Sequence, residues 1–210
     1  MGGRVFEGAV DGMIVPGKAR PSIFGGSGAG ATACASSSDV IADADKDSFT
    51  AYGGASWVID AQTLLQSTLS YTLHDGYLSD PYKRAFVVES AGTVRDARPD
   101  SRELWALSAR LRHYVGIANA AVHVDYRFFH DDWEIDAHTL EVSWNQVLGE
   151  SWRLTPALRW YSQSQAYFYA PYYASARGDG LASSDYRLSP YGALSARVDL
   201  RKVLGNWELG

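Results

Sequence analysis

The sequence predicts an all-β protein, an antiparallel up-and-down sheet that closes into a transmembrane β-barrel. Two observations favour this fold. Segments of about ten residues alternate apolar and polar side chains, as a strand with two different faces does. The connections between the segments alternate between short and long, which is typical of outer-membrane barrels. Because the charged residues lie inside the segments, a soluble sheet with one wet face also fits the pattern.

The strands are expected in chain order at 48–59, 62–73, 102–115, 119–130, 137–148, 152–163 and 186–200, with an eighth beginning near 206. Short turns are expected at 60–61, 116–119, 149–151 and 204–206, and long connections at 74–101 and 164–185, with 131–136 of intermediate length. Short and long connections would therefore lie at opposite ends of the sheet. We expect about eight strands. They either form the whole barrel or are part of a larger one.

Composition narrows the class of protein. The chain has 210 residues, a net charge of -5 and no basic stripe, which argues against a nucleic-acid partner. Aromatic residues make up 13%, a share that suits girdles at two membrane interfaces. Several lie towards strand ends: Trp105, Tyr114, Trp152, Trp160 and Tyr161. The single cysteine, Cys34, excludes an intrachain disulfide and a zinc site built on paired thiolates.

Two zones divide the chain. Residues 1–47 are rich in Gly, Ala and Ser, and we expect an irregular segment with one strand near 4–10, either a loop or plug or a flexible segment. Residues 48–210 form the barrel. The first residues lack an apolar leader and 206–210 resembles the opening of a further strand, so we expect an incomplete chain that is truncated at its C-terminus.

Charged residues of the central strands are expected to share the lumenal face, namely Arg110, Arg112, His123, Asp125, Arg127, Glu141 and Arg159. Turn lengths suggest the register. The predicted pairs are Arg110 with Asp125, Arg112 with His123, Glu141 with Arg159 and, if His130 pairs with His138, Arg127 with Glu141. Arg127, Glu141 and Arg159 would then form a charge ladder across three strands, with neighbouring Cβ atoms about 5 Å apart.

The connection around 131–136 is the densest polar cluster in the chain. Its imidazoles and carboxylates are weak candidates for metal ligands: His130, Asp131, Asp132, Asp136 and His138. A solvated acidic loop with turn-forming aspartates is the alternative. The spacing matches no known metal motif, so we predict no metal site and no cofactor.

The connection 74–101 carries a second group of candidates, namely Tyr77, Asp80, Tyr82, Lys83, Arg98 and Asp100. One interpretation is a loop that folds over the lumen mouth or contacts a partner, and the other is an ordinary structured hairpin loop. Arg98 offers an anion site or, alternatively, a local lock between aspartate and arginine.

The segment 167–173 is an aromatic loop, which suits sugar stacking, contact with the outer leaflet, or packing upon itself. It supports the alternative function of a soluble all-β module that binds a glycan. No GxSxG elbow is present, so we predict that the chain is not an enzyme and keep a hydrolase in the barrel wall as a distant alternative.

Several motifs together resemble a known family. They lie at 76–83, 98–102, 126–128 with 131–133, 138–139, and 159–163 with 167–169. In this combination the chain is similar to a bacterial family of unknown function, numbered thirty-five-seventy among such domains, over roughly residues 50 to 200. The resemblance implies a porin-like barrel in the outer membrane of a Gram-negative bacterium, without an established substrate or catalytic residue.

These observations lead to a functional expectation. We predict a channel, receptor or assembly partner with a charged lumen. Its partners would be outer-membrane lipid, a small solute or extracellular ligand, and the outer-membrane assembly machinery.

Overall fold

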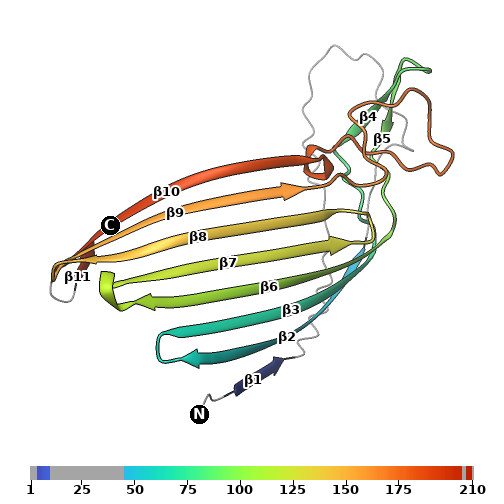
Figure 1. Ribbon diagram of the computed structural model, residues 1–210. Coiled ribbons are helices and arrows are strands. Elements are labelled where there is room, and N and C mark those ends of the chain that lie inside the picture. The colour runs from blue at the N-terminus through green and yellow to red at the C-terminus, as the bar shows by residue number, and fades with distance from the viewer. Residues whose placement is uncertain (1–3, 10–44, 205–206, 210) are drawn as a thin grey trace.

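The protein is an all-β chain built around one large antiparallel sheet, as the sequence predicts (Figure 1). The computed structural model describes residues 4–9, 45–204 and 207–209. Nine strands form the sheet, in the order β1-β2-β3-β6-β7-β8-β9-β10-β11. Their bounds are β1 Arg4–Ala9, β2 Lys46–Asp60, β3 Thr63–Gly76, β6 Ser101–Val115, β7 Ala120–Asp131, β8 Asp136–Leu148, β9 Trp152–Gln163, β10 Tyr191–Leu204 and β11 Trp207–Leu209.

Sequence neighbours pair with each other throughout the sheet, which is the up-and-down topology. The predicted strand near 4–10 is present as β1, and the predicted eighth strand is present as β11. In the described residues β1 and β11 are the two edges of the sheet. The predicted irregular segment falls mainly on 10–44, which lies outside the described residues.

The connections separate into two kinds, as predicted. Residues 61–62, 116–119 and 149–151 are short turns at one end of the sheet, and 116–118 form the short 3-10 helix η2 (Gly116–Ala118). Residues 77–100, 132–135 and 164–190 lie together at the other end, on the right in Figure 1. We call these three segments the loop cap.

The structure corrects the predicted start of the strand at 186–200. Residues 186–188 form the 3-10 helix η3 (Tyr186–Leu188), and β10 begins only at Tyr191. The Asp185 carboxylate accepts a hydrogen bond from the backbone N–H of Arg187, which favours a helical turn. Pro190 follows and has no N–H for a ladder, so pairing with β9 starts after it.

The loop cap contains structure that periodicity did not predict. Within 77–100, β4 (Arg84–Val87) and β5 (Gly92–Arg95) form a separate two-stranded hairpin. Backbone hydrogen bonds join this hairpin to the other long connection, since Val88 N–H donates to the Tyr173 carbonyl at 2.8 Å and Ala97 N–H to the Ala182 carbonyl at 2.8 Å. The two long connections therefore fold as one unit.

Both buried apolar clusters of the described residues lie in or against the loop cap. One comprises Trp133, Ile135, Ala166, Phe168 and Leu188, with Phe129 of the sheet packed against it. The other comprises Ala85, Val87, Tyr173 and Ala182. The cap is thus a small packed unit with its own core.

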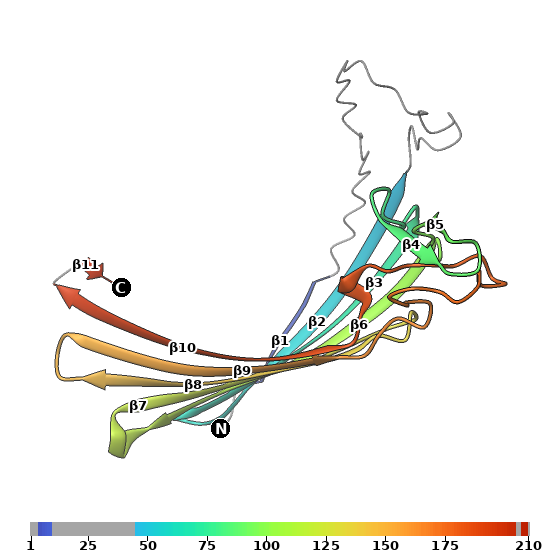
Figure 2. The same ribbon diagram turned by 90° about the horizontal axis from the view of Figure 1, so that it is seen from above.

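The large sheet is different, because it forms a single layer that twists and curves along its length (Figure 2). The buried residues of its strands are alanines, namely Ala106, Ala120, Ala137 and Ala157, together with Asp131. Large apolar side chains of the same strands stay exposed, for example Leu158 at 58% and Leu194 at 75%. Among the described residues, no helix is both long enough and apolar enough to cross a membrane.

Candidate functional site

The sheet has two chemically different faces. Strand alternation and the observed register place Val124, Val142 and Leu158 on one face, directly opposite one another in adjacent strands. We call this the apolar face. The seven charged residues predicted to share a face all lie on the other, which we call the polar face. Across β6 to β9 one continuous row of this face reads Arg110, Asp125, Glu141 and Arg159.

Three of the four predicted pairings are present. Arg110 lies opposite Asp125 and Arg112 opposite His123, because the turn at 116–119 lets Val115 pair with Ala120. Glu141 lies opposite Arg159, because the turn at 149–151 lets Leu148 pair with Trp152. In both hairpins the turn length determines the register.

The predicted pairing of Arg127 with Glu141 is wrong. His130 pairs with Asp136 rather than with His138, so Arg127 lies opposite Thr139. The turn is shorter than expected because the Asp131 carboxylate accepts hydrogen bonds from the N–H groups of Trp133 and Ile135, at 3.1 and 2.9 Å. The slip is two residues, so the faces are preserved but the partners change.

The observed register brings two carboxylates together. Asp125 lies directly opposite Glu141, an arrangement that destabilises a sheet unless cations intervene. Both Nη atoms of Arg112 bind the Asp125 carboxylate at 3.0 Å, and Arg110 Nε lies 3.4 Å from it. Glu141 has its nearest guanidinium in Arg197 of β10, at 3.7 Å. Arginines of two strands, β6 and β10, therefore contact the acidic pair.

The row lines a hollow of about 500 Å³ on the polar face. Its walls come from β6 to β9, and its lining includes Ser108, Arg110, Arg112, Asp125, Arg127, Thr139, Glu141 and Arg159. Four guanidinium groups thus meet two carboxylates there, although the chain as a whole is acidic.

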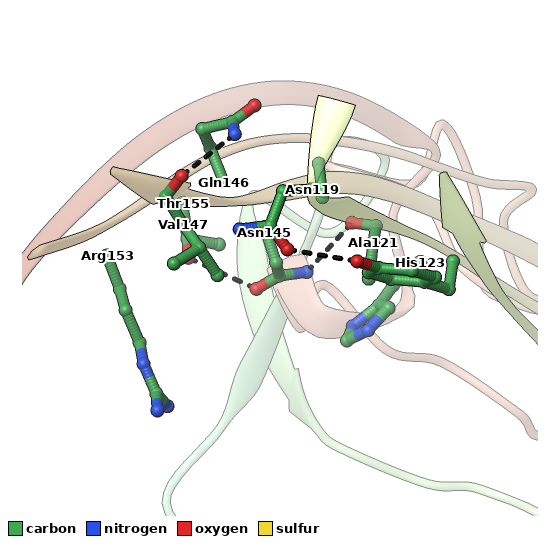
Figure 3. Close-up of a pocket in the computed structure, with 10 residues that line it drawn as sticks. Asn119, Ala121, His123, Asn145, Gln146, Val147, Arg153 and Thr155 are labelled. Carbon is green, nitrogen blue, oxygen red and sulfur yellow. Dashed lines mark hydrogen bonds between the residues drawn. The ribbon is translucent and has the colours of Figure 1, made fainter. Parts of the chain in front are cut away.

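A second hollow lies on the polar face near the short turns (Figure 3). His123 lines it together with Tyr114, Asn145, Arg153 and Thr155. Its polar groups bind one another, since Thr155 Oγ1 donates to Asn145 Oδ1 at 3.1 Å and Asn145 Nδ2 donates to the Ala121 carbonyl at 3.4 Å. Sequence analysis did not single out this amide cluster, although Asn145 and Thr155 have the strand parity of the polar face.

Two of the strand-end aromatic residues also lie on the polar face. Tyr114 shares the parity of Arg112, and its hydroxyl donates to Asn119 Oδ1 at 2.9 Å. Tyr161 shares the parity of Arg159 and packs against Tyr191 with ring centroids 5.1 Å apart. Only Trp105, Trp152 and Trp160 of the five predicted belt residues therefore lie on the apolar face.

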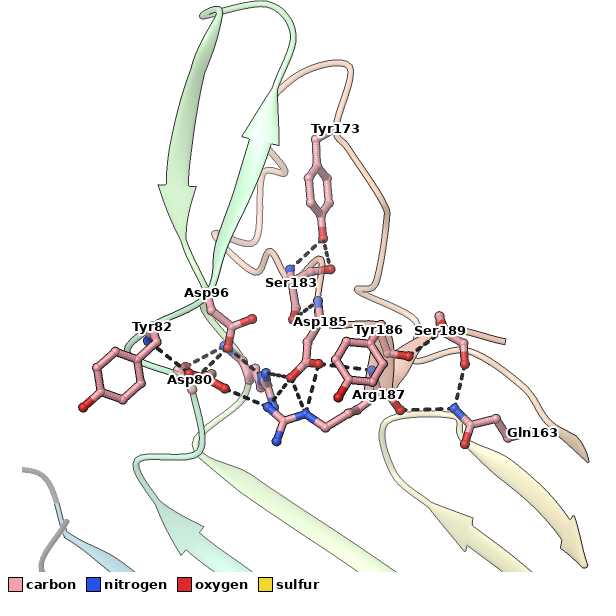
Figure 4. A network of polar contacts seen from close by, with 12 residues as sticks. Asp80, Tyr82, Asp96, Gln163, Tyr173, Ser183, Asp185, Tyr186, Arg187 and Ser189 are labelled. Atoms are coloured by element: carbon pink, nitrogen blue, oxygen red, sulfur yellow. Dashed lines mark hydrogen bonds and ion pairs between the residues drawn. The ribbon is translucent and has the colours of Figure 1, made fainter. Parts of the chain in front are cut away.

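The loop motif contributes to a network of aspartates and arginines inside the loop cap (Figure 4). Arg98 Nε binds Asp96 at 2.6 Å, and its Nη2 binds Asp185 of the other long connection at 2.8 Å. Arg187 binds Asp185 as well, and its Nη2 lies 2.7 Å from the Asp80 carboxylate. The predicted lock between aspartate and arginine exists, but it joins two loops instead of closing one.

Electrostatics hold this network in its charged form. The Asp185 side chain is completely buried, which by itself raises its pKa. Hydrogen bonds from Arg187 and Arg98 outweigh that effect, and the pKa of Asp185 lies well below its usual range. The carboxylate is therefore ionised at every ordinary pH.

Other residues of the loop motif have separate roles. The Lys83 ammonium lies 5.1 Å from the centre of the Tyr186 ring, and the Asp100 carbonyl accepts from Gly76 N–H at 2.8 Å. Tyr77 donates its backbone N–H to the Asp45 carbonyl at 2.9 Å. Tyr82 is 79% exposed. The structure therefore does not bring the motif together around one ligand.

The metal candidates are not brought together either. Asp131 is buried and binds Arg102, whereas His130 Nδ1 contacts Asp136 at 2.7 Å on the opposite face. His138 Nδ1 contacts the Tyr126 hydroxyl at 2.8 Å. Asp132 Oδ1 accepts from the Glu103 N–H, and burial raises the pKa of its carboxyl. Within the described part of the chain, no group of three or more His, Cys, Asp and Glu side chains is arranged to hold a metal ion.

The aromatic loop mostly packs upon itself. Phe168 is fully buried against Trp133, with ring centroids 5.2 Å apart. Tyr173 is 7% exposed, and its hydroxyl donates to backbone carbonyls of the same loop. Tyr167 and Tyr172 of the same loop remain exposed.

Sequence analysis missed Asp96, Asp185 and Arg187. A signal was available, because Asp96 and Arg98 are two residues apart and so are Asp185 and Arg187. The same Asp-X-Arg spacing in both long connections is compatible with two loops that exchange ion pairs.

The fold and site define a class of protein, a single antiparallel sheet with one charged face and a packed loop cap at one end. A family model described as "Protein of unknown function (DUF3570)" matches residues 24–209, and the chain belongs to this family. The predicted family resemblance is thereby confirmed. No curated protein and no solved structure matches the chain.

Proposed function

We propose that the chain is an outer-membrane β-barrel protein of a Gram-negative bacterium. In this proposal the apolar face meets lipid, and the polar face lines a lumen that serves a channel, a receptor or an assembly partner. The observation that carries the proposal is the exposed apolar face. A soluble monomer rarely leaves so extensive an apolar surface in contact with water.

The exposed fractions support lipid contact. Leu69, Leu107, Leu158, Leu194 and Val198 come from four strands and are 40–75% exposed. Apolar side chains of neighbouring strands lie opposite one another across the sheet. Leu140 and Leu194, for example, pair with Trp160 from its two sides. In water this surface would favour aggregation, whereas in a bilayer it needs no further cover.

The aromatic residues of the apolar face lie towards its two ends. Trp105 and Trp160 lie near the loop cap, and Trp144 and Trp152 lie near the short turns. Trp160 and Trp152 are eight residues apart in β9, so their Cα atoms are separated by about 27 Å along the strand. At the usual barrel tilt of about 40°, this spans about 20 Å of membrane, close to the apolar band of known barrels.

Lysine placement supports an interface at the short turns. The Lys202 ammonium lies 5.1 Å from the centre of the Trp152 ring. A lysine beside a tryptophan suits the boundary between lipid and water, because the stem lies in the apolar region and the charge reaches the headgroups. The short turns would then face the periplasm and the loop cap would face the outside.

The loop cap lies on the lumenal side in this proposal. Phe129 and Arg102 belong to the polar face by strand parity. Phe129 packs against the cap cluster that contains Trp133, and the Arg102 guanidinium lies 4.3 Å from the centre of the Trp133 ring. The cap would therefore cover part of the lumen mouth. This agrees with the prediction of a loop that folds over the mouth. The proposal includes no enzymatic step.

The proposal requires the sheet to close into a barrel. An open sheet edge in lipid leaves backbone groups without hydrogen-bond partners, so β1 and β11 must pair with each other or with further strands. Outer-membrane barrels acquire such pairing with the help of assembly machinery, which is the expected protein partner.

Protease protection tests the proposal. The full chain is reconstituted in liposomes and digested from outside. We expect fragments covering 102–163 to be protected, with cleavage limited to exposed loops such as 77–100 and 164–190. Cleavage throughout 102–163 would exclude a membrane barrel.

Adjacent cysteines provide a matched control. In a Cys34→Ser background, Leu158→Cys and Arg159→Cys place a thiol on the apolar and polar faces of the same strand. An environment-sensitive dye should report lipid at 158 and water at 159. Equal signals at both positions would contradict the proposal.

A further inference from the structure

The hollow on the polar face holds more guanidinium groups than its own carboxylates can occupy. Arg112 forms a two-pronged contact with Asp125, which commits both of its Nη atoms. Arg110 supports the same carboxylate at 3.4 Å. Glu141 is reached from outside the hollow by Arg197 at 3.7 Å.

Two further arginines line the same hollow. Among the described residues, no carboxylate oxygen lies within 4.0 Å of a guanidinium nitrogen of Arg127 or Arg159. Arg127 comes from β7 and Arg159 from β9, so one strand separates them. With that strand between them and an offset of two residues, their Cα atoms are about 12 Å apart, a gap that two arginine side chains can span.

The groups between them are suited to an anion as well. Thr139 lies opposite both Arg127 and Tyr161, between the two arginines, and its hydroxyl can donate a hydrogen bond. Ser108 lies on the other side of Arg127 and also lines the hollow. Cations and hydroxyl donors therefore surround the open space.

We propose that this hollow binds a small solute that carries a phosphate group, held by Arg127 and Arg159. Guanidinium forks match the oxygen geometry of phosphate, and two of them complement a dianion. The volume of about 500 Å³ admits a phosphate ester the size of a sugar phosphate. This inference rests on the proposed function for its role, because in a barrel the site would lie in the path of solutes through the lumen.

The ligand is a solute and not a lipid headgroup. The hollow opens on the polar face, whereas Leu140 and Leu158 of the same strands point to the apolar face. Phosphate groups of lipids would meet the rim of the apolar face and could not reach the row of Asp125 and Glu141.

Calorimetric titration of the full chain in detergent micelles with inorganic phosphate tests the inference. We expect saturable binding. The double variant Arg127→Gln/Arg159→Gln should bind at least tenfold more weakly, because each variant loses a charge-assisted contact. Arg153→Gln is the matched control: it removes an arginine of β9 that lines the other hollow, and it should bind like the parent.

Three outcomes would overturn the inference: no saturable phosphate binding by the parent, unchanged binding by the double variant, or an equal loss in Arg153→Gln. Circular dichroism of each variant establishes that it is folded, and Arg127→Lys/Arg159→Lys keeps the charge and should restore part of the affinity.

The micelle titration requires neither insertion nor a pore. Phosphate binding together with failed protease protection in liposomes would therefore refute the membrane function alone. Protection without binding would refute the phosphate site alone.

Discussion

The loop cap and the large sheet are built on opposite physical plans. The cap buries Phe168, Trp133 and Ile135 almost completely and encloses ion pairs around Asp185. The sheet has far more hydrogen-bonded residues, but the residues that its strands bury are alanines and Asp131. The cap therefore contains its own source of stability, whereas the sheet depends on what covers its apolar face.

Removing a fully buried aromatic side chain of the cap should have the largest effect. Phe168→Ala should cost about 4 kcal/mol, because it leaves a cavity beside Trp133. Limited proteolysis in liposomes should show faster cleavage of 77–100 and 164–190 without loss of protection in the sheet. Tyr172→Ala, at an exposed position of the same loop, is the control. Equal sensitivity of sheet and cap would show that the two are not independent.

Breaking the buried ion pairs should have the next largest effect. Asp185→Asn should destabilise the cap by about 3 kcal/mol, because Arg98 and Arg187 lose the charge that both of them contact. Asp179→Asn removes an exposed, solvent-screened pair with Arg177 and should cost much less. Urea titration followed by loop proteolysis measures both variants. A similar cost for the two would contradict a buried network.

A charge introduced on the apolar face tests whether the stability of the sheet depends on lipid covering that face. Leu158→Arg should reduce the free energy of folding into liposomes by about 1–3 kcal/mol, because residue 158 lies between the membrane midplane and the interface at Trp160. Ser143→Arg places the same charge on the polar face of the neighbouring strand and should cost far less. The fraction of chain that folds into liposomes during urea titration gives both values. Equal losses would indicate that lipid does not contact the apolar face.

Acid should have the smallest effect, a loss of stability in the loop cap at low pH. The pKa of Asp185 is lower in the folded cap than in an unfolded chain, where it is about 3.9. The unfolded state therefore binds more protons, and the stability contributed by Asp185 is complete above about pH 5 and declines as the pH falls below about 4. The difference in stability between the parent and Asp185→Asn should shrink in that range and stay constant from pH 5 to 8.

Periodicity predicted the sheet well, because side chains of a strand alternate strictly between two faces. That rule alone placed Arg110, Asp125, Glu141 and Arg159 on one face, and two short turns gave the correct register for β6–β7 and β8–β9. The start of β10 was wrong because a hydrogen bond to the Asp185 carboxylate favours a local helical turn.

The loop cap could not be predicted in the same way. Its residues have no repeating period, and its core joins 132–135 with 164–190, which are neighbours only after the strands have paired. The partners of Asp185 come from two segments, Arg98 and Arg187, and only the spacing shared by the two loops hinted at them. Periodicity placed Arg127 and Arg159 of the proposed phosphate site on the polar face. Whether a carboxylate lies opposite Arg127 depends on the register of β7 and β8, which periodicity does not determine.

Asp131 has an effect far from where it lies. By shortening one turn, its carboxylate sets Asp125 opposite Glu141 about 20 Å away along the sheet. A frame shifted by two residues would keep both faces intact yet place Arg127 opposite Glu141 and occupy the guanidinium that the phosphate site requires. Asp131, at the rim of the sheet, thus decides whether Arg127 is neutralised by a carboxylate of the sheet or stays available to a bound ligand.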